Sequence, residues 1–264
     1  MGRRRGKERS KVGGNMRKIA IVNNKGGVGK TSSAFNIGAY FSKKGFKVLM
    51  IDLDSQGNLT GTYGIKDNQI ENTIYEMIKG QKLTPIKISE TMDLIPATLE
   101  TELANIEFVN RPSWSLLLKR FLVNYEDKYD ICIIDSSPSL NILTKNAFGA
   151  ADSIYIPMRP GIYEYRGADL LVRSINEIKL DNPGLEIKGI FLTLYENRTN
   201  LSKDIEMHMQ SKFGSILMET KIRKSLSVEE CPATRTSVFE SGTKSAGARD
   251  YEKLALEILQ REGL

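Results

Sequence analysis

Short, continuous apolar runs alternate along the chain with longer segments in which apolar residues recur at helical spacing. Such runs are typical of strands covered on both faces, not of strands with one face in water. The pattern predicts strands at 18–22, 48–52, 92–95, 131–135, 154–157 and 187–194, and helices at 31–44, 114–123, 141–150, 165–178, 201–213 and 246–260. This alternation predicts an α/β fold, with a mainly parallel twisted sheet and helices on both of its faces.

Length and charge fit one folded domain preceded by a short basic segment. The chain has 264 residues, 40% of them hydrophobic, and its formal net charge is +6. Residues 1–16 hold six basic residues and one acid, which leaves 32 basic against 31 acidic residues in the remainder. We therefore expect a disordered basic tail over 1–16 and a single domain over 17–264. The tail is either an arm that grips phosphates or merely solvated, and it has no aromatic residue to stack on bases.

A glycine-rich loop follows the first predicted strand and precedes the first predicted helix. It reads Asn24-Lys25-Gly26-Gly27-Val28-Gly29-Lys30-Thr31, and its glycines let backbone N–H groups come close to phosphate oxygens. This context is typical of a P-loop, although Asn24 stands where the strict motif has glycine. Lys30 can reach the β and γ phosphates, and the Thr31 hydroxyl can coordinate magnesium. The residues predicted to bind the nucleotide are Lys25, Gly26, Gly27, Val28, Gly29, Lys30, Thr31 and Ser32.

Three aspartates come at the ends of predicted strands. Asp52 and Asp54 close the second strand, and residues two apart on a strand project to the same side. Both are expected to face the edge of the sheet where open α/β folds bind ligands. Asp135 ends a hydrophobic run, an arrangement typical of a Walker B strand whose acid holds magnesium through water.

These motifs together resemble those of the ParA/MinD superfamily of deviant Walker A ATPases. The resemblance rests on Lys25, which opens the loop as in KGGxGK[T/S], on the segment Asp52-Leu53-Asp54-Ser55-Gln56-Gly57-Asn58, and on the run ending in Asp135. Weaker segments, among them Ile95-Pro96-Ala97-Thr98 and Asn197-Arg198-Thr199-Asn200-Leu201, are most similar to the ParA/Soj branch. The match covers residues 17–261.

The resemblance implies a weak Mg-dependent ATPase that works as a homodimer, with ATP sandwiched between two subunits. Lys25 would reach across the interface to the nucleotide of the partner subunit, and Asp54 would position the attacking water. The implied catalytic residues are Lys25, Lys30 and Asp54, the implied metal ligands are Thr31, Asp52 and Asp135, and the implied cofactors are ATP and Mg²⁺. Ser55 and Ser137 stand where the family usually has proline.

A DNA-binding surface is also implied by the resemblance. Arg198 matches an arginine of that surface, and the second arginine stretch of the family reads Ile222-Arg223-Lys224-Ser225-Leu226-Ser227-Val228 in this chain. Ser227 stands where the DNA-contacting arginine would be, and Arg223 with Lys221 can compensate for it. The predicted DNA-binding residues are Arg198, Arg223 and Lys224, which would contact phosphates of double-stranded DNA without sequence preference.

The leading hypothesis for function is partitioning of a plasmid or chromosome. The protein would dimerise on ATP and bind DNA non-specifically, and a ParB-like centromere-binding protein would stimulate hydrolysis. We expect a cytoplasmic protein associated with the nucleoid. The start of the chain lacks an apolar signal segment, and no apolar run is long enough to cross a membrane.

Three alternatives compete with partitioning. In a MinD-like ATPase that positions cargo at a membrane, the last helix would be basic and amphipathic; here it carries Glu252, Glu257 and Glu262, which favours docking on the domain. A metallocluster ATPase such as dinitrogenase reductase needs paired cysteines, which Cys132 and Cys231 do not supply. An ATPase that positions a protein organelle or another cargo would use the same chemistry and stays open.

Overall fold

The computed structural model describes residues 15–196, 200–240 and 245–264. The predicted basic tail over 1–16 therefore lies almost wholly outside the described residues. Met16, the last residue assigned to it, is buried in the hydrophobic core. Arg198 also lies outside the described residues.

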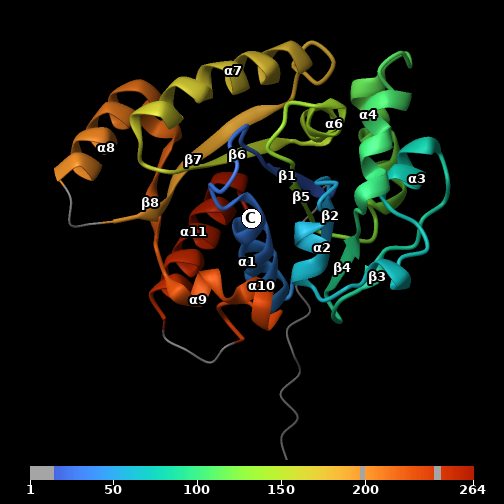
Figure 1. Ribbon diagram of the computed structural model, residues 1–264, viewed down its shortest axis with the longest axis horizontal. Coiled ribbons are helices and arrows are strands. Elements are labelled where there is room, and N and C mark those ends of the chain that lie inside the picture. Colours follow the sequence, from blue (N-terminus) through green and yellow to red (C-terminus); the bar gives the residue numbers. More distant parts are fainter. Residues whose placement is uncertain (1–14, 197–199, 241–244) are drawn as a thin grey trace, which may run out of the picture.

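A single sheet organises the described part of the chain (Figure 1). Its eight strands run in the order β3-β4-β2-β5-β1-β6-β7-β8, and every neighbouring pair is parallel except β3 with β4. The strands are β1 Arg17–Ile21, β2 Val48–Asp52, β3 Ile86–Lys87, β4 Met92–Ile95, β5 Ile131–Asp135, β6 Ser153–Met158, β7 Glu186–Tyr195 and β8 Leu217–Arg223. The predicted α/β fold with a mainly parallel sheet is confirmed.

Helices cover both faces of this sheet, and side chains of one strand alternate between two hydrophobic cores. On β1, Ala20 packs into the larger core, whereas Ile19 and Ile21 pack into the other. The larger core lies under α3, α5, α6, α7 and α8, and the smaller under α1 and α11. The helices are α1 Lys30–Lys43, α2 Asn58–Thr62, α3 Ile74–Lys79, α4 Ala104–Glu107, α5 Leu117–Leu122, α6 Ile142–Ala150, α7 Ile162–Ile178, α8 Asn200–Phe213, α9 Leu226–Glu229, α10 Cys231–Thr234 and α11 Ala246–Glu262.

Two strands at the margins of the sheet escaped the sequence pattern. β3 has two residues, too few for a periodicity, and β8 mixes apolar with charged residues because it is an edge strand. The short helices α2, α3, α4, α9 and α10 were not predicted either. The predicted docking of the last helix is confirmed, since Leu254, Ala255 and Ile258 of α11 are fully buried. None of the helices in the described ranges is long and apolar enough to span a membrane.

Candidate nucleotide site

The glycine-rich loop connects β1 to α1 at the carboxyl edge of the sheet. Gly27 and Gly29 have φ angles of 69° and 81°, in the left-handed region that side chains disfavour. Gly29 is the N-cap of α1, and Lys30 is the first helical residue. The loop thus delivers its backbone to the positive end of a 14-residue helix, which is an environment suited to phosphate.

Hydrogen bonds to two other strands, β6 and β7, hold this loop in place. The Asn23 amide donates to the Pro157 carbonyl of β6 at 2.7 Å, and its oxygen accepts from the Lys25 N–H at 3.0 Å. The Thr193 hydroxyl of β7 donates to the Val28 carbonyl at 2.8 Å. Sequence reasoning missed both residues. Asn23 is a polar residue at the end of an apolar run, which is a usable signal, but nothing local marks Thr193.

The two loop lysines have different surroundings. The Lys30 ammonium is almost fully buried and donates to the Lys25 carbonyl at 2.8 Å. Burial lowers the pKa of Lys30, and the nearby carboxylates of Asp135 and Asp54 oppose that shift. The side chain of Lys25 is half-buried, and within the described part of the chain its ammonium has neither a hydrogen bond nor an ion pair. The Lys30 ammonium is therefore held inside the loop, whereas the positive charge of Lys25 has no counter-charge among the described residues.

Asp52 and Asp135 are direct neighbours across the sheet, in register at the ends of β2 and β5. Both are fully buried. Asp52 is well satisfied, because it accepts from the Thr60 N–H at 2.9 Å, the Thr60 hydroxyl at 2.8 Å and the Asp54 N–H at 3.0 Å. Burial nevertheless raises the pKa of Asp52 to about 6.

Asp135 has no comparable support. Neither of its carboxylate oxygens accepts a hydrogen bond from the residues that the structure describes. Burial and the neighbouring Asp52 raise the pKa of Asp135 well above its ordinary value, and the nearby Thr31 hydroxyl and Lys30 ammonium oppose this only in part. A buried carboxylate without a partner is costly unless a cation or ordered water completes it. This orphaned carboxylate beside the Thr31 hydroxyl fits the donor set that a hard divalent cation prefers.

Asp54 lies just beyond β2 and is less tightly held than Asp52. It accepts from the Gln56 N–H at 3.1 Å and from the Asn58 amide at 3.4 Å, and it is 6% exposed. The Asp54 carboxylate is near enough to Lys30 to oppose the lowering of the Lys30 pKa by burial. We call Lys25, Lys30, Asp52, Asp54 and Asp135 the loop cluster. The structure brings all five predicted residues to one edge of the sheet.

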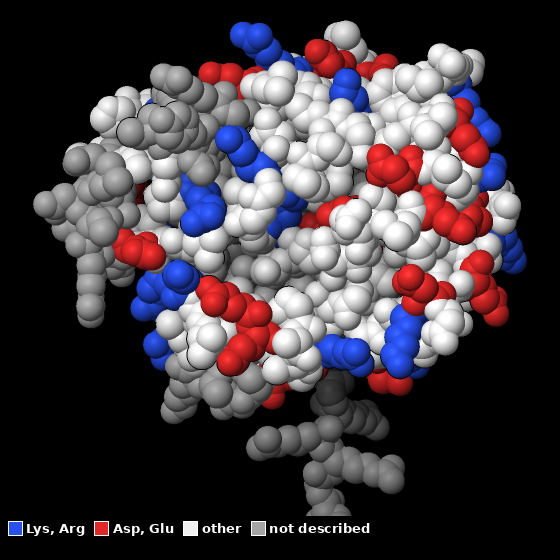
Figure 2. Space-filling model, in the orientation of Figure 1, with Lys and Arg blue, Asp and Glu red and all other residues white. Residues whose placement is uncertain are grey.

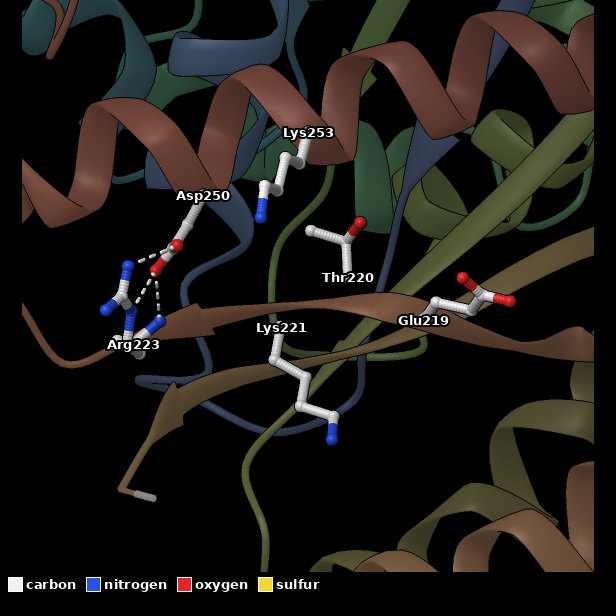
Figure 3. A pocket seen from close by; sticks show the side chains of 6 residues that line it. All are labelled: Glu219, Thr220, Lys221, Arg223, Asp250 and Lys253. Carbon is white, nitrogen blue, oxygen red and sulfur yellow. Dashed lines mark hydrogen bonds and ion pairs between the residues drawn. The ribbon is translucent and has the colours of Figure 1, made fainter.

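Two of the predicted DNA-binding residues, Arg223 and Lys224, lie elsewhere, at and just beyond the end of β8, and the third, Arg198, lies outside the described residues. The Arg223 guanidinium donates to Asp250 of α11 from Nε at 2.9 Å and from Nη2 at 2.7 Å, so the side chain is already paired with a carboxylate (Figure 3). A groove of about 330 Å³ opens beside this pair. Its lining, which we call the edge cluster, is Glu219, Thr220, Lys221, Arg223, Asp250 and Lys253. Lys224 is exposed just beyond β8.

Ser227, at the position of the family's DNA-contacting arginine, does not point to an open basic surface. Its hydroxyl donates to the Ser245 hydroxyl at 3.1 Å and lies 2.9 Å from that of Ser225. A β-carbon on Gly247 would come within 2.9 Å of the same hydroxyl. The serine is therefore fitted into the contact between α9 and the start of α11.

Comparison with known proteins places the chain among ATP-binding and partition proteins. Residues 16–187 match a family described as an AAA domain. The chain is 35% identical over 253 residues to the chromosome-partitioning ATPase Soj of Treponema pallidum, a match that covers 93% of this chain and 98% of that protein.

Two solved structures share both the fold and most of the length. One is described as a cobyrinic acid a,c-diamide synthase from Mycobacterium smegmatis, with an ATP analog and magnesium. It matches with a TM-score of 0.82 at 29% identity, over 94% of this chain and 96% of that one. A plasmid partition protein from Borrelia burgdorferi bound to AMPPNP matches with a TM-score of 0.80 at 25% identity, over 93% and 99% of the two chains.

Proposed function

Because the chain belongs to the ParA/Soj family of chromosome-partitioning ATPases, we propose that it hydrolyses ATP with Mg²⁺ to partition a plasmid or chromosome. The observation that carries the proposal is the loop cluster, where two lysines of the glycine-rich loop lie near a buried carboxylate that accepts no hydrogen bond from the described residues. Phosphoryl transfer to water requires mainly positioning and charge neutralisation, and these groups supply both.

Each residue of the loop cluster takes a distinct part in this proposal. The backbone of residues 25–32 and the Lys30 ammonium hold the phosphates. Thr31 and Asp135 would hold Mg²⁺, with Asp52 behind them, and Mg²⁺ held there would supply positive charge to the phosphates. Asp54 has fewer and longer hydrogen bonds than Asp52 and lies near Lys30, and it orients the attacking water.

The Lys25 ammonium, which has no partner among the described residues, supports a homodimer. A half-buried cation at the edge of a phosphate site is well placed to meet the nucleotide of a second, facing subunit. The ATP-bound dimer would then bind duplex DNA without sequence preference, and a ParB-like centromere-binding protein would stimulate hydrolysis and release. Nucleoid association follows from this DNA binding.

The test is the oligomeric state of Asp54→Ala measured by light scattering with ATP and Mg²⁺. We expect the variant to bind ATP but hydrolyse it poorly, so that it accumulates as a dimer while the parent protein cycles back to monomer. Asp67→Ala, which removes an exposed carboxylate between α2 and α3, should behave as the parent does. An Asp54→Ala protein that stays monomeric at saturating ATP contradicts the assigned role.

A further inference from the structure

Four large apolar side chains are exposed along one side of the segment that leads from β4 toward α5. Leu99 is 69% exposed, Leu103 44%, Ile106 72% and Val109 52%. The segment begins as a 3-10 turn at Leu99–Leu103 and continues as α4, so the spacings of four and three residues keep Leu99, Leu103 and Ile106 on one side, and Val109 follows just after α4 ends at Glu107. We call these four residues the α4 stripe.

The α4 stripe is not the part of this segment that packs on the domain. Thr101, Ala104 and Phe108 are fully buried and occupy the opposite side of the same helical turns. The segment is thus anchored to the larger core through one side and leaves a second apolar side in solvent. Contiguous apolar patches on the surface of a folded protein commonly mark sites of interaction with another molecule.

Acidic residues flank the stripe on both sides. Glu102 lies on one side, Glu100 and Glu107 lie on the other, and residues 99–109 contain no basic residue. Glu107 is partly neutralised by Lys79 at 3.8 Å, but Glu100 is exposed. Figure 2 shows acidic side chains gathered around uncharged surface on the side of the molecule where α4 lies. The surface therefore complements an apolar face bordered by cations.

Hydrogen bonds connect this segment to the nucleotide site. The Ser55 hydroxyl, next to Asp54, donates to Glu102 at 2.9 Å, and the Asn105 amide donates to the same carboxylate at 2.9 Å. The Asn105 oxygen accepts from the N–H of Ile142, the first residue of α6, at 3.2 Å. A molecule bound on the stripe would thus lie beside the loop that carries Asp54.

We propose that the α4 stripe is the docking surface for a basic amphipathic helix of a partner protein. This assignment rests on the proposed function, because the partner would be a protein that acts together with a partitioning ATPase. A second copy of this chain is the poorer occupant, because two stripes meeting about a two-fold axis would bring Glu100, Glu102 and Glu107 of each chain together. A helix with apolar residues at the same spacing and lysine or arginine beside them satisfies both features of the surface.

The experiment uses the full chain and an 18-residue peptide of leucine and lysine, with leucines on one helical face. Asn110→Cys provides an exposed labelling point beside the stripe, since Cys132 and Cys231 are both buried. A fluorophore at that position reports peptide binding. We expect the combined change Leu103→Ser with Ile106→Ser to weaken binding at least tenfold. Leu180→Ser, at a site 87% exposed elsewhere, should change it less than twofold.

A peptide with the same leucines but glutamate for lysine should bind at least tenfold more weakly than the basic one. Equal binding of the two peptides, or equal binding to the stripe variant and the parent, overturns the proposal. Loss of ATP-dependent dimerisation in the stripe variant would also overturn it, by showing a subunit interface. Peptide binding requires no hydrolysis, so a parent protein that binds the basic peptide through the stripe but does not hydrolyse ATP would refute the proposed function alone.

Discussion

The loop cluster and the edge cluster both concentrate charge at the ends of strands, but they differ in how that charge is paired. In the loop cluster, Asp135 has no hydrogen bond within the described residues, and the Lys25 ammonium has no partner there. In the edge cluster, Arg223 is paired with Asp250, and Lys221 with Glu206 of α8. Within the described residues, the first region thus leaves charged groups unpaired, whereas the second pairs Arg223 and Lys221 with acids.

This difference bears on what each region can bind. A buried charge without a partner strengthens the binding of a ligand of opposite charge, because the free-energy cost of burying that charge is already included in the folded state. A surface whose cations are already paired must give up those pairs before it can hold phosphate. In the proposed function, the loop cluster would accordingly hold an anion with a metal tightly, and the edge cluster would make only a weak and salt-sensitive contact.

The largest expected effect separates the two loop lysines. Lys30→Ala removes a buried ammonium from the phosphate site and should weaken ATP binding about a hundredfold, since a hydrogen bond to a charged group contributes about 3 kcal/mol. Lys25→Ala should keep ATP affinity within a few-fold but lose dimerisation and hydrolysis. Isothermal titration calorimetry with ATP and Mg²⁺ measures the ATP affinity, and light scattering measures dimerisation. Lys43→Ala, at the far end of α1, is the control; equal losses of ATP affinity in both loop variants would remove the distinction between them.

The next effect concerns the buried charge of Asp135. Asp135→Asn should raise the free energy of unfolding of the nucleotide-free protein by about 1–3 kcal/mol at pH 8, because it removes a buried carboxylate that has no hydrogen bond from the described residues. It should also abolish the extra stability that Mg²⁺ adds to the ATP complex.

The pH dependence of this effect has a defined sign. Burial raises the pKa of Asp135 in the folded state, so the folded protein holds a proton that the unfolded chain releases as pH rises above about 4. The parent therefore loses stability relative to Asp135→Asn as pH rises through that window, and the difference shrinks toward low pH. Urea unfolding at pH 5 and pH 8 measures it, and a difference that grows on acidification would contradict the burial argument.

A smaller effect is expected where a distant strand supports the loop. Thr193→Val preserves shape but leaves the Val28 carbonyl without its 2.8 Å donor, at a cost of about 1–2 kcal/mol in unfolding free energy. ATP affinity should fall several-fold, because the loop loses an anchor. Thr234→Val, which removes an exposed hydroxyl that bonds within its own helix, should cost less than about 0.5 kcal/mol. Unfolding and ATP titration of both variants check this, and equal effects would show that the Thr193 anchor is dispensable.

The same contrast between clusters explains what sequence could predict. Residues 24–31 are contiguous, and Asp52 and Asp135 each end an apolar run, so local patterns predicted which residues meet at the loop. The pairing of Arg223 with Asp250 spans two elements and depends on where α11 lies over β8, which no local pattern shows. Thr193 was missed for the same reason, and β8 because an edge strand keeps charged residues among its apolar ones.

The smallest expected effect is on DNA binding, which the pairing of Arg223 with Asp250 in the edge cluster should limit. Asp250→Asn removes the charge that holds Arg223 and should raise ATP-dependent affinity for duplex DNA several-fold, with a log–log salt slope steeper by about one. Arg223→Gln should lower affinity and make the slope shallower by the same amount. Asp67→Asn, an exposed carboxylate between α2 and α3, controls for net charge. Filter binding of the full chain with ADP and with ATP isolates the nucleotide-dependent part from any contribution of residues 1–14.

Because Asp250 is buried, the thermal midpoint of each variant is compared with that of the parent, so that a DNA affinity lowered by unfolding is recognised. If a folded Asp250→Asn protein binds DNA no better than Asp67→Asn does, Arg223 is a structural residue that ties β8 to α11, and the DNA surface of this chain lies elsewhere.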